Sequence, residues 1–323
     1  MVTVLIAVLL VTVVAPVAVW ALRRRGVLDV PGSRTLHEIP TARGGGLAVA
    51  PAVTIAALLS GELSSVTLLT VVLSALALGV IGFVDDIRGL PALPRLGAQV
   101  MAGLTVAIVV SEGVVPLPLL SVPAGALACV YYINAFNFMD GINGISVAQT
   151  TVAGVHLAIV GRSIDVEQIT VVGLAVTGAA LAFAPWNAPH ARLFLGDVGS
   201  YFLGFILAGT ALVAVISGAS VLLVVAPFTL YLVDTASTLV RRFRRGVRLT
   251  EAHREHAFQR LVASGYSHVR VSFCVLVLMG LSSAVVLVSD GRGIVMETVI
   301  GVLAWIPAVA FVLVADRRFG AQP

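Results

Sequence analysis

The feature that most constrains this chain is a series of long apolar stretches along almost its whole length. A helix needs about 20 apolar residues to cross about 30 Å of hydrocarbon. Backbone groups surrounded by lipid must pair within their own segment, so such stretches predict helices. Eleven stretches approach this length: residues 2–22, 44–60, 65–83, 95–111, 115–134, 145–161, 167–185, 200–217, 219–240, 271–289 and 294–315.

The composition agrees with lipid as the main solvent. Of the residues, 59% are hydrophobic and 11% are charged, whereas soluble domains carry about 45–50% apolar and about 25% charged residues. We therefore predict an all-α, polytopic transmembrane helical bundle with about 11 spans. Residues 1–323 form a single membrane domain in this interpretation, and no nucleic-acid partner is expected.

The arginines predict how the bundle is oriented. All 20 basic residues are arginine. If every second connection between the predicted spans lies on one side of the membrane, all the arginines except Arg162 and Arg292 fall on that side. Because positive residues stay on the cytoplasmic side, this side is cytoplasmic, the N-terminus is outside and the C-terminus is inside. The expected location is the inner (cytoplasmic) membrane, crossed several times. The cytoplasmic loops cover about residues 23–43, 84–94, 135–144, 186–199 and 241–270.

Three of these loops carry acidic residues in unusual settings. Asp85 and Asp86 end the third stretch, where adjacent carboxylates repel unless a cation compensates. A carboxylate beside hydrocarbon is a functional candidate, although a solvated helix end with Arg88 as partner explains the pair equally simply. Asp197 lies in Gly196-Asp197-Val198-Gly199-Ser200, where it either holds a metal or caps the helix that follows.

The loop after residue 134 adds amides, a further acid and two glycines. It contains Asn137, Asp140 and Asn143, with Gly141 and Gly144 to let backbone approach a ligand closely. Asp140 and Asn143 share a face if this turn is helical. The alternative is an ordinary Asn/Gly-rich turn between two spans.

Basic residues and histidines complete the cytoplasmic side. His253, Arg254 and His256 lie in the longest loop, where a helix would align the two histidines. Zinc requires three or four protein ligands, so phosphate binding explains this group better. The first loop adds Arg34, His37 and Arg43, followed by three glycines that allow close helix packing. Acids on the same face as Arg and His, with no Cys or Lys nucleophile, favour Mg²⁺, with Mn²⁺ as a substitute, bridging substrate phosphates.

These motifs, in this order, resemble the polyprenyl-phosphate N-acetylhexosamine-1-phosphate transferase superfamily (glycosyltransferase family 4). The resemblance covers about residues 29–260 and is carried by four segments: residues 82–86, 134–141, 194–200 and 253–256. It is closer to the glycan-initiating branch, which starts O-antigen and related cell-surface polysaccharides, because the related phospho-MurNAc-pentapeptide translocase has three clustered histidines. Many relatives place Asp where this chain has Asn143.

The resemblance implies a reaction and roles for the residues. A UDP-N-acetylamino sugar and polyprenyl (undecaprenyl) phosphate would give polyprenyl-diphospho-sugar and UMP, with or without a covalent aspartyl intermediate. Asp85, Asp86, Asp140 and Asp197 would be catalytic, and Asp197 and Asp140 would hold the metal. The substrate-binding residues would be Arg43, Asn137, Asn143, His253, Arg254 and His256. The resemblance is also compatible with a homodimer.

Two other functions fit parts of the pattern. The phospho-MurNAc-pentapeptide translocase of peptidoglycan synthesis belongs to the same superfamily. A secondary transporter also has about this many helices, but its charged sites gather near the midplane of the membrane on broken helices. Here the acids gather at one face, which favours the enzyme.

Overall fold

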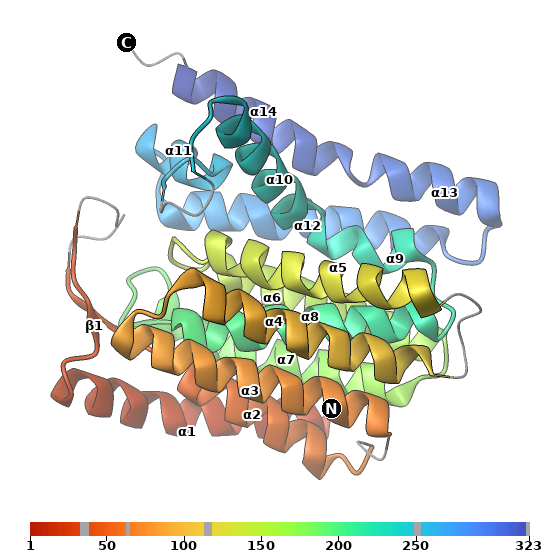
Figure 1. Ribbon diagram of the computed structural model, residues 1–323, viewed down its shortest axis with the longest axis horizontal. Helices are drawn as coiled ribbons and strands as arrows, with labels where there is room; N and C mark the ends of the chain where they lie inside the picture. Colours follow the sequence, from red (N-terminus) through yellow and green to blue (C-terminus); the bar gives the residue numbers. More distant parts are fainter. Residues whose placement is uncertain (33–38, 63–64, 113–117, 249–252, 321–323) are drawn as a thin grey trace.

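The computed structural model describes residues 1–32, 39–62, 65–112, 118–248 and 253–320 as a bundle of helices lying side by side (Figure 1). The helices are α1 (Val2–Arg24), α2 (Gly46–Leu59), α3 (Val66–Arg88), α4 (Ala92–Ser111), α5 (Pro118–Met139), α6 (Ile145–Ser163), α7 (Glu167–Asn187), α8 (Gly196–Ile216), α9 (Val221–Val225), the 3-10 helix η1 (Ala226–Phe228), α10 (Thr229–Arg244), α11 (Ala257–Ala263), α12 (His268–Ser289), α13 (Ile294–Leu303) and α14 (Ile306–Gly320). The strands are β1 (Leu28–Asp29), β2 (Thr41–Arg43) and β3 (Leu193–Phe194).

The prediction of a helical, multi-pass membrane protein is confirmed. In the described parts of the chain, nine helical segments are long and apolar enough to cross a membrane. The two other predicted stretches, 44–60 and 145–161, are also helical, as α2 with 14 residues and α6 with 19. α2 packs against α1, and α6 packs against α7, so both belong to the bundle.

Two predicted spans are interrupted: residues 294–315 divide into α13 and α14, and residues 219–240 are broken for a clear chemical reason. Residues 219–240 fold as α9, η1 and α10 instead of one regular helix. Pro227 lies in the interruption, and proline has no N–H to donate within a helix. Gln149 of α6 donates its side-chain amide to the Pro227 carbonyl at 2.9 Å, so the carbonyl beside the break has a partner inside the bundle.

Several loops are shorter than predicted because helices extend into them. α3 continues to Arg88, α5 to Met139 and α10 to Arg244, and α8 already begins at Gly196. The loop predicted over 241–270 also contains α11. A small sheet, which the sequence analysis did not predict, joins two other loops: β2 pairs antiparallel with β1 and parallel with β3.

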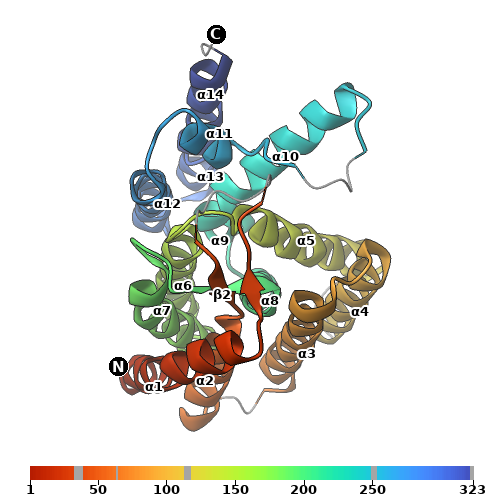
Figure 2. The ribbon, with the colours of Figure 1, turned by 90° about the vertical axis from the view of Figure 1, so that its left-hand side faces the viewer.

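Helix α8 is the central helix of the bundle. In the apolar stretch of α8 that is long enough to span a membrane, 72% of the residues are buried. The same share is 28% for α1 and for α4. Figure 2 looks onto the end of the bundle where the sheet lies, with α8 surrounded by other helices. β3 leads directly into α8, so the sheet and the first turn of α8 meet at this end. The N-terminus lies towards the opposite end of the bundle from the C-terminus (Figure 1).

Candidate active site

The first turn of α8 is held by a carboxylate from another helix. Asp86 of α3 accepts hydrogen bonds from the backbone N–H groups of Asp197 at 2.9 Å and Val198 at 3.1 Å. The N–H groups that open a helix lack partners within it, and they favour a negative charge. Asp86, whose side chain is fully buried, therefore occupies the position at the start of α8 where a ligand anion would otherwise bind.

Asp197 does not cap α8, so that alternative is wrong. It belongs to the first turn, and its carboxylate faces outwards from the helix to pair with other elements. One oxygen lies 2.9 Å from a guanidinium nitrogen of Arg43 on β2. The same oxygen accepts a hydrogen bond of 2.9 Å from the side-chain amide of Asn137 on α5. Asp197 thus joins the sheet, α5 and α8 at one point.

Arg43 is the cation at the centre of this group. Its Nε lies 2.7 Å from Asp86, in addition to the contact with Asp197. Burial alone would lower the pKa of Arg43, but the carboxylates of Asp197 and Asp86 outweigh this effect and raise it, so the guanidinium stays charged. β2 places Arg43 here through its register with β3, in which Arg43 is opposite Phe194.

Asp85, the neighbour of Asp86 on α3, lies close enough to Asp197 to interact with its carboxyl and has three further partners. It accepts from the backbone N–H of Leu90 at 2.7 Å, from Arg95 of α4 at 2.7 Å and from the hydroxyl of Tyr201 on α8 at 3.0 Å. The sequence analysis missed Arg95 and Tyr201 as members of the site. Tyr201 could have been found, because it lies four residues after Asp197 and such positions share a helix face.

Asp140 lies just after the end of α5. Its Oδ1 accepts a hydrogen bond of 2.5 Å from the Ser146 hydroxyl. Burial raises the pKa of Asp140 to about 6, against the opposing hydrogen bond from Ser146, and the charges of Asp197 and Arg43 also act on it. A cation near such a buried carboxyl favours its ionised form.

Asn143 does not join the acidic residues, and the expectation of a shared helical face with Asp140 is wrong. α5 ends at Met139 and α6 begins at Ile145, so the turn between them is not helical. Gly144 has φ 86°, a conformation that favours glycine. The Asn143 side chain donates to the Pro189 carbonyl at 2.9 Å, away from Asp197.

Glycines let the backbones of three helices meet at this point. A Cβ on Gly82 of α3 would lie 2.2 Å from the Asp197 carbonyl oxygen, and one on Gly46 of α2 would lie 2.2 Å from the Gly199 nitrogen. Only a residue without a side chain fits at either position. The predicted role of the glycines that open α2, close helix packing, is confirmed for Gly46.

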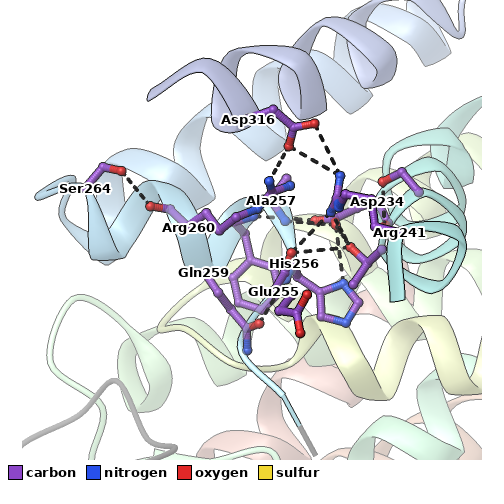
Figure 3. A network of polar contacts seen from close by, with 12 residues as sticks. Asp234, Arg241, Glu255, His256, Ala257, Gln259, Arg260, Ser264 and Asp316 are labelled. Atoms are coloured by element: carbon purple, nitrogen blue, oxygen red, sulfur yellow. Dashed lines mark hydrogen bonds and ion pairs between the residues drawn. The ribbon is translucent and has the colours of Figure 1, made fainter. Parts of the chain in front are cut away.

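The histidines form a second group beside the first. His253 and His256 are not on a common helix, because α11 begins only at Ala257, so the predicted helical alignment is wrong. Their rings nevertheless stack with centroids 5.0 Å apart. Nδ1 of His256 lies 3.3 Å from the buried carboxylate of Asp234 on α10 (Figure 3). Arg254, one of the two residues between them in the motif, is partly buried.

The end of α5 joins the two groups. The ring of Phe138, the residue after Asn137, has its centroid 5.9 Å from that of His256. Phe258 of α11 packs on Gly141, next to Asp140. The predicted binding residues Arg34 and His37 lie outside the described residues, so the structure does not place them.

We expect His253 to make folding pH-dependent. Burial, reinforced by His256 and Arg242, lowers the pKa of His253 to about 4, whereas an unfolded chain keeps a value of about 6.5. Between these values the unfolded state binds more protons, so His253 contributes a loss of stability as the pH falls from about 6.5 to about 4. Melting temperatures in detergent at pH 7 and pH 5 measure this effect.

The variant His253→Gln should lose less stability on acidification than the unaltered protein. His190→Gln, which replaces an exposed imidazole, controls for the substitution itself. An equal loss of stability in the His253 variant and the unaltered protein would show that this imidazole titrates normally in the fold.

Comparisons with known proteins agree with the family that the motifs resemble. Residues 68–215 match the family model described as glycosyl transferase family 4. One relative is the Bacillus subtilis (strain 168) protein named "Probable undecaprenyl-phosphate N-acetylglucosaminyl 1-phosphate transferase". The two sequences are 27% identical over a match that covers 85% of this chain and 80% of the relative. A second relative is the decaprenyl-phosphate N-acetylglucosaminephosphotransferase of Mycolicibacterium smegmatis. It is 28% identical to this chain over a match that covers 80% of this chain and 74% of the relative.

A third relative comes from the other branch. The phospho-N-acetylmuramoyl-pentapeptide-transferase of Clostridium botulinum (strain Alaska E43 / Type E3) is 29% identical to this chain. The match covers 66% of this chain and 70% of the relative. The family model covers Asp85, Asp86, Asn137, Asp140 and Asp197. These matches support the resemblance that the motifs indicated, to the polyprenyl-phosphate N-acetylhexosamine-1-phosphate transferase superfamily (glycosyl transferase family 4).

Proposed function

We propose that the protein transfers a sugar-1-phosphate from a UDP-N-acetylamino sugar to polyprenyl phosphate, giving polyprenyl-diphospho-sugar and UMP. The observation that carries the proposal is the convergence of Arg43, Asp86, Asn137 and Asp197 from four separate segments at one end of a membrane bundle. The names of the relatives point to UDP-N-acetylglucosamine as donor. The product would start a cell-surface glycan.

The proposed reaction balances as a single displacement at phosphorus. An oxygen of the lipid phosphate forms a bond to the β-phosphorus, which carries the sugar. The bond from this phosphorus to the oxygen that bridges to the α-phosphate breaks, and UMP leaves with that oxygen. Catalysis of this kind relies on positioning and on stabilising the charge spread over the phosphate oxygens.

The contacts of the acids favour direct attack over a covalent aspartyl intermediate. The oxygens of Asp85 and Asp86 already accept from N–H, guanidinium or hydroxyl groups of the protein. We therefore assign these two residues to positioning: Asp86 fixes the start of α8, and Asp85 fixes α3 against α4 and α8. Arg43 is charged and one third exposed, which suits it to bind a phosphate.

The histidine group would bind the nucleotide sugar beside the acids. Because the pKa of His253 is about 4, this imidazole is neutral at pH 7 and would act as a hydrogen-bonding group. The positive charge for the diphosphate would then come from Arg254 and Arg43. Asn137 would orient the carboxylate of Asp197, to which it donates.

Mg²⁺, which Mn²⁺ could replace, belongs to the same proposal. Within the described residues, no group of three or more His, Cys, Asp or Glu side chains is arranged to hold a metal. Mg²⁺ is nevertheless held in many phosphate sites by one or two carboxylates together with substrate phosphates, and the hard oxygens of Asp197 and Asp140 fit this requirement. When bound, the ion would neutralise negative charge on the diphosphate.

The orientation in the membrane is also part of the proposal. We infer eleven spans, with the N-terminus outside, the C-terminus in the cytoplasm and the active site facing the cytoplasm across the inner membrane. The arginine distribution and the chain ends at opposite ends of the bundle support this. Labelling of single cysteines placed at Arg162 and Arg317 with an impermeant reagent tests it: only the first should react in intact cells. Light scattering in detergent tests the accompanying homodimer.

The two alternatives have less support. Three relatives named phospho-N-acetylmuramoyl-pentapeptide-transferase match 53–67% of this chain, whereas five relatives named as N-acetylglucosamine-phosphate transferases match 78–85%. The acids of the site lie at the ends of α3, α5 and α8, whereas transporter sites lie near the midplane of the membrane.

The decisive experiment is UMP release by the purified protein in detergent. We expect UMP with polyprenyl phosphate, Mg²⁺ and UDP-N-acetylglucosamine, and none when the lipid is left out. A chelator should abolish the release, and added Mg²⁺ or Mn²⁺ should restore it, because the diphosphate charge would otherwise stay uncompensated.

A panel of other UDP-N-acetylamino sugars, including UDP-MurNAc-pentapeptide, separates the branches of the superfamily. UMP release with that substrate alone would replace the proposal by the translocase. Release that is unchanged by the chelator would remove the metal from the proposal. Folded protein that releases no UMP with any donor would contradict the transfer itself.

A further inference from the structure

The position of the histidine group depends on a very short helix. α11 has seven residues, and isolated helices of this length do not hold together in water. Its start is fixed by Asp234 of α10, which accepts from the backbone N–H of Ala257 at 2.9 Å. His256 is the residue before this helix, so its place depends on where α11 lies.

A second carboxylate fixes the side of α11. Asp316 of α14 pairs with Arg260 of α11, and both of its oxygens lie 3.3 Å from Arg241 of α10 (Figure 3). α14 packs against both α10 and α11. One carboxylate thus joins the last helix, α14, to two helices that precede it in the chain, α10 and α11.

The two arginines need this carboxylate. Arg241 and Arg260 converge on the same point (Figure 3), and the Arg260 side chain is only 10% exposed. Like charges repel, and a guanidinium removed from water is costly unless it is paired. Without the charge of Asp316, the repulsion would push α11 away from α10.

The effect would reach the histidines through short contacts. Arg241 donates to the backbone carbonyl of Glu255 at 3.2 Å, directly before His256. The ring of His256 stacks on His253 and lies beside Phe138. Displacement of α11 would therefore move both imidazoles relative to the end of α5, where Asn137 and Asp140 begin the acidic group.

We propose that Asp316, on the last helix of the chain, is a positioning residue for the histidine group. By pairing with Arg241 and Arg260, it holds α11, and with it His256 and His253, beside the acidic residues. It touches no reacting atom in this arrangement. The kinetic consequence rests on the proposed function, in which the histidines bind the nucleotide sugar; the structural consequence does not.

The kinetic test replaces Asp316 by asparagine, which keeps the shape and removes the charge. We expect the KM for the UDP-sugar to rise about tenfold, with the KM for polyprenyl phosphate unchanged. Asp316→Glu should restore most of the loss because it restores the charge. Arg317→Gln, which changes the next and exposed residue of the same helix, should behave like the unaltered protein.

A second measurement does not depend on activity. Hydrogen exchange of the backbone amides of residues 257–263 should be faster in Asp316→Asn, while exchange in α3 and α8 stays the same. If Asp316→Asn disturbs the fold beyond α11, a double variant that swaps the two charges, Arg260→Asp with Asp316→Arg, provides the test. It should bring the rate of hydrogen exchange in α11 back towards that of the unaltered protein. Unchanged exchange in α11, or no recovery in the double variant, would overturn the proposal even if no UMP release were found.

Discussion

Replacing Asp197 by alanine is expected to lower the rate of UMP release by about 10³-fold or more while the protein stays folded. The Asp197 carboxylate is 13% exposed and lies between Arg43 and Asn137, so it faces the space where a cation and the diphosphate would meet. Its loss removes a negative charge needed only when they bind. The backbone N–H of residue 197 still donates to Asp86, so the start of α8 keeps its cap.

Two further variants separate chemistry from folding. Asp197→Asn keeps the shape and should be almost as inactive as the alanine variant, because the charge is what a metal requires. Asp86→Asn should lose stability as well as activity, since a buried carboxylate then no longer caps α8; removing such bonds costs about 1–3 kcal/mol. Retention of more than a tenth of the UMP release by Asp197→Ala would exclude this carboxylate from the reaction.

The helices of this protein could be predicted because their signal is local. Each apolar stretch is long enough to define a helix without reference to its neighbours, and all eleven are helical. The helix ends were less predictable. α3, for example, continues past Asp85 and Asp86 to Arg88, because Gly89, at φ 64°, ends it and Asp85 holds the following turn.

The roles of the acids could not be read from the sequence in the same way. Asp86 was selected because of its neighbour Asp85, but its partners are 111 and 112 residues away in the chain. The sheet that brings Arg43 to Asp197 has strands of two or three residues, too short to show a period in the sequence. Only the three-dimensional arrangement distinguishes Asp197, which is partly open, from Asp86, which is enclosed.

Gly82→Ala is expected to cause a large loss of stability, although it adds only one methyl group. The added Cβ would lie 2.2 Å from the carbonyl oxygen of Asp197 and 2.7 Å from the nitrogen of Val198. Both are backbone atoms, so no side chain can turn aside. α3 and α8 would have to separate, at a cost of about 3 kcal/mol. This outweighs the gain of about 1 kcal/mol that alanine normally brings to a helix.

Separation of these helices would also disable the site. Asp86 lies one turn after Gly82 on α3, so moving the helix pulls its carboxylate away from the start of α8. A displacement of about 1 Å at a catalytic group can cost about 10²-fold in rate, and we expect a loss of at least this size in UMP release. Gly97→Ala is the matched control, since no atom lies within 4 Å of a Cβ at that position of α4. It should keep its activity and melt at the same or a higher temperature. A Gly82→Ala protein as stable and active as this control would mean that α3 and α8 are not in backbone contact at the site.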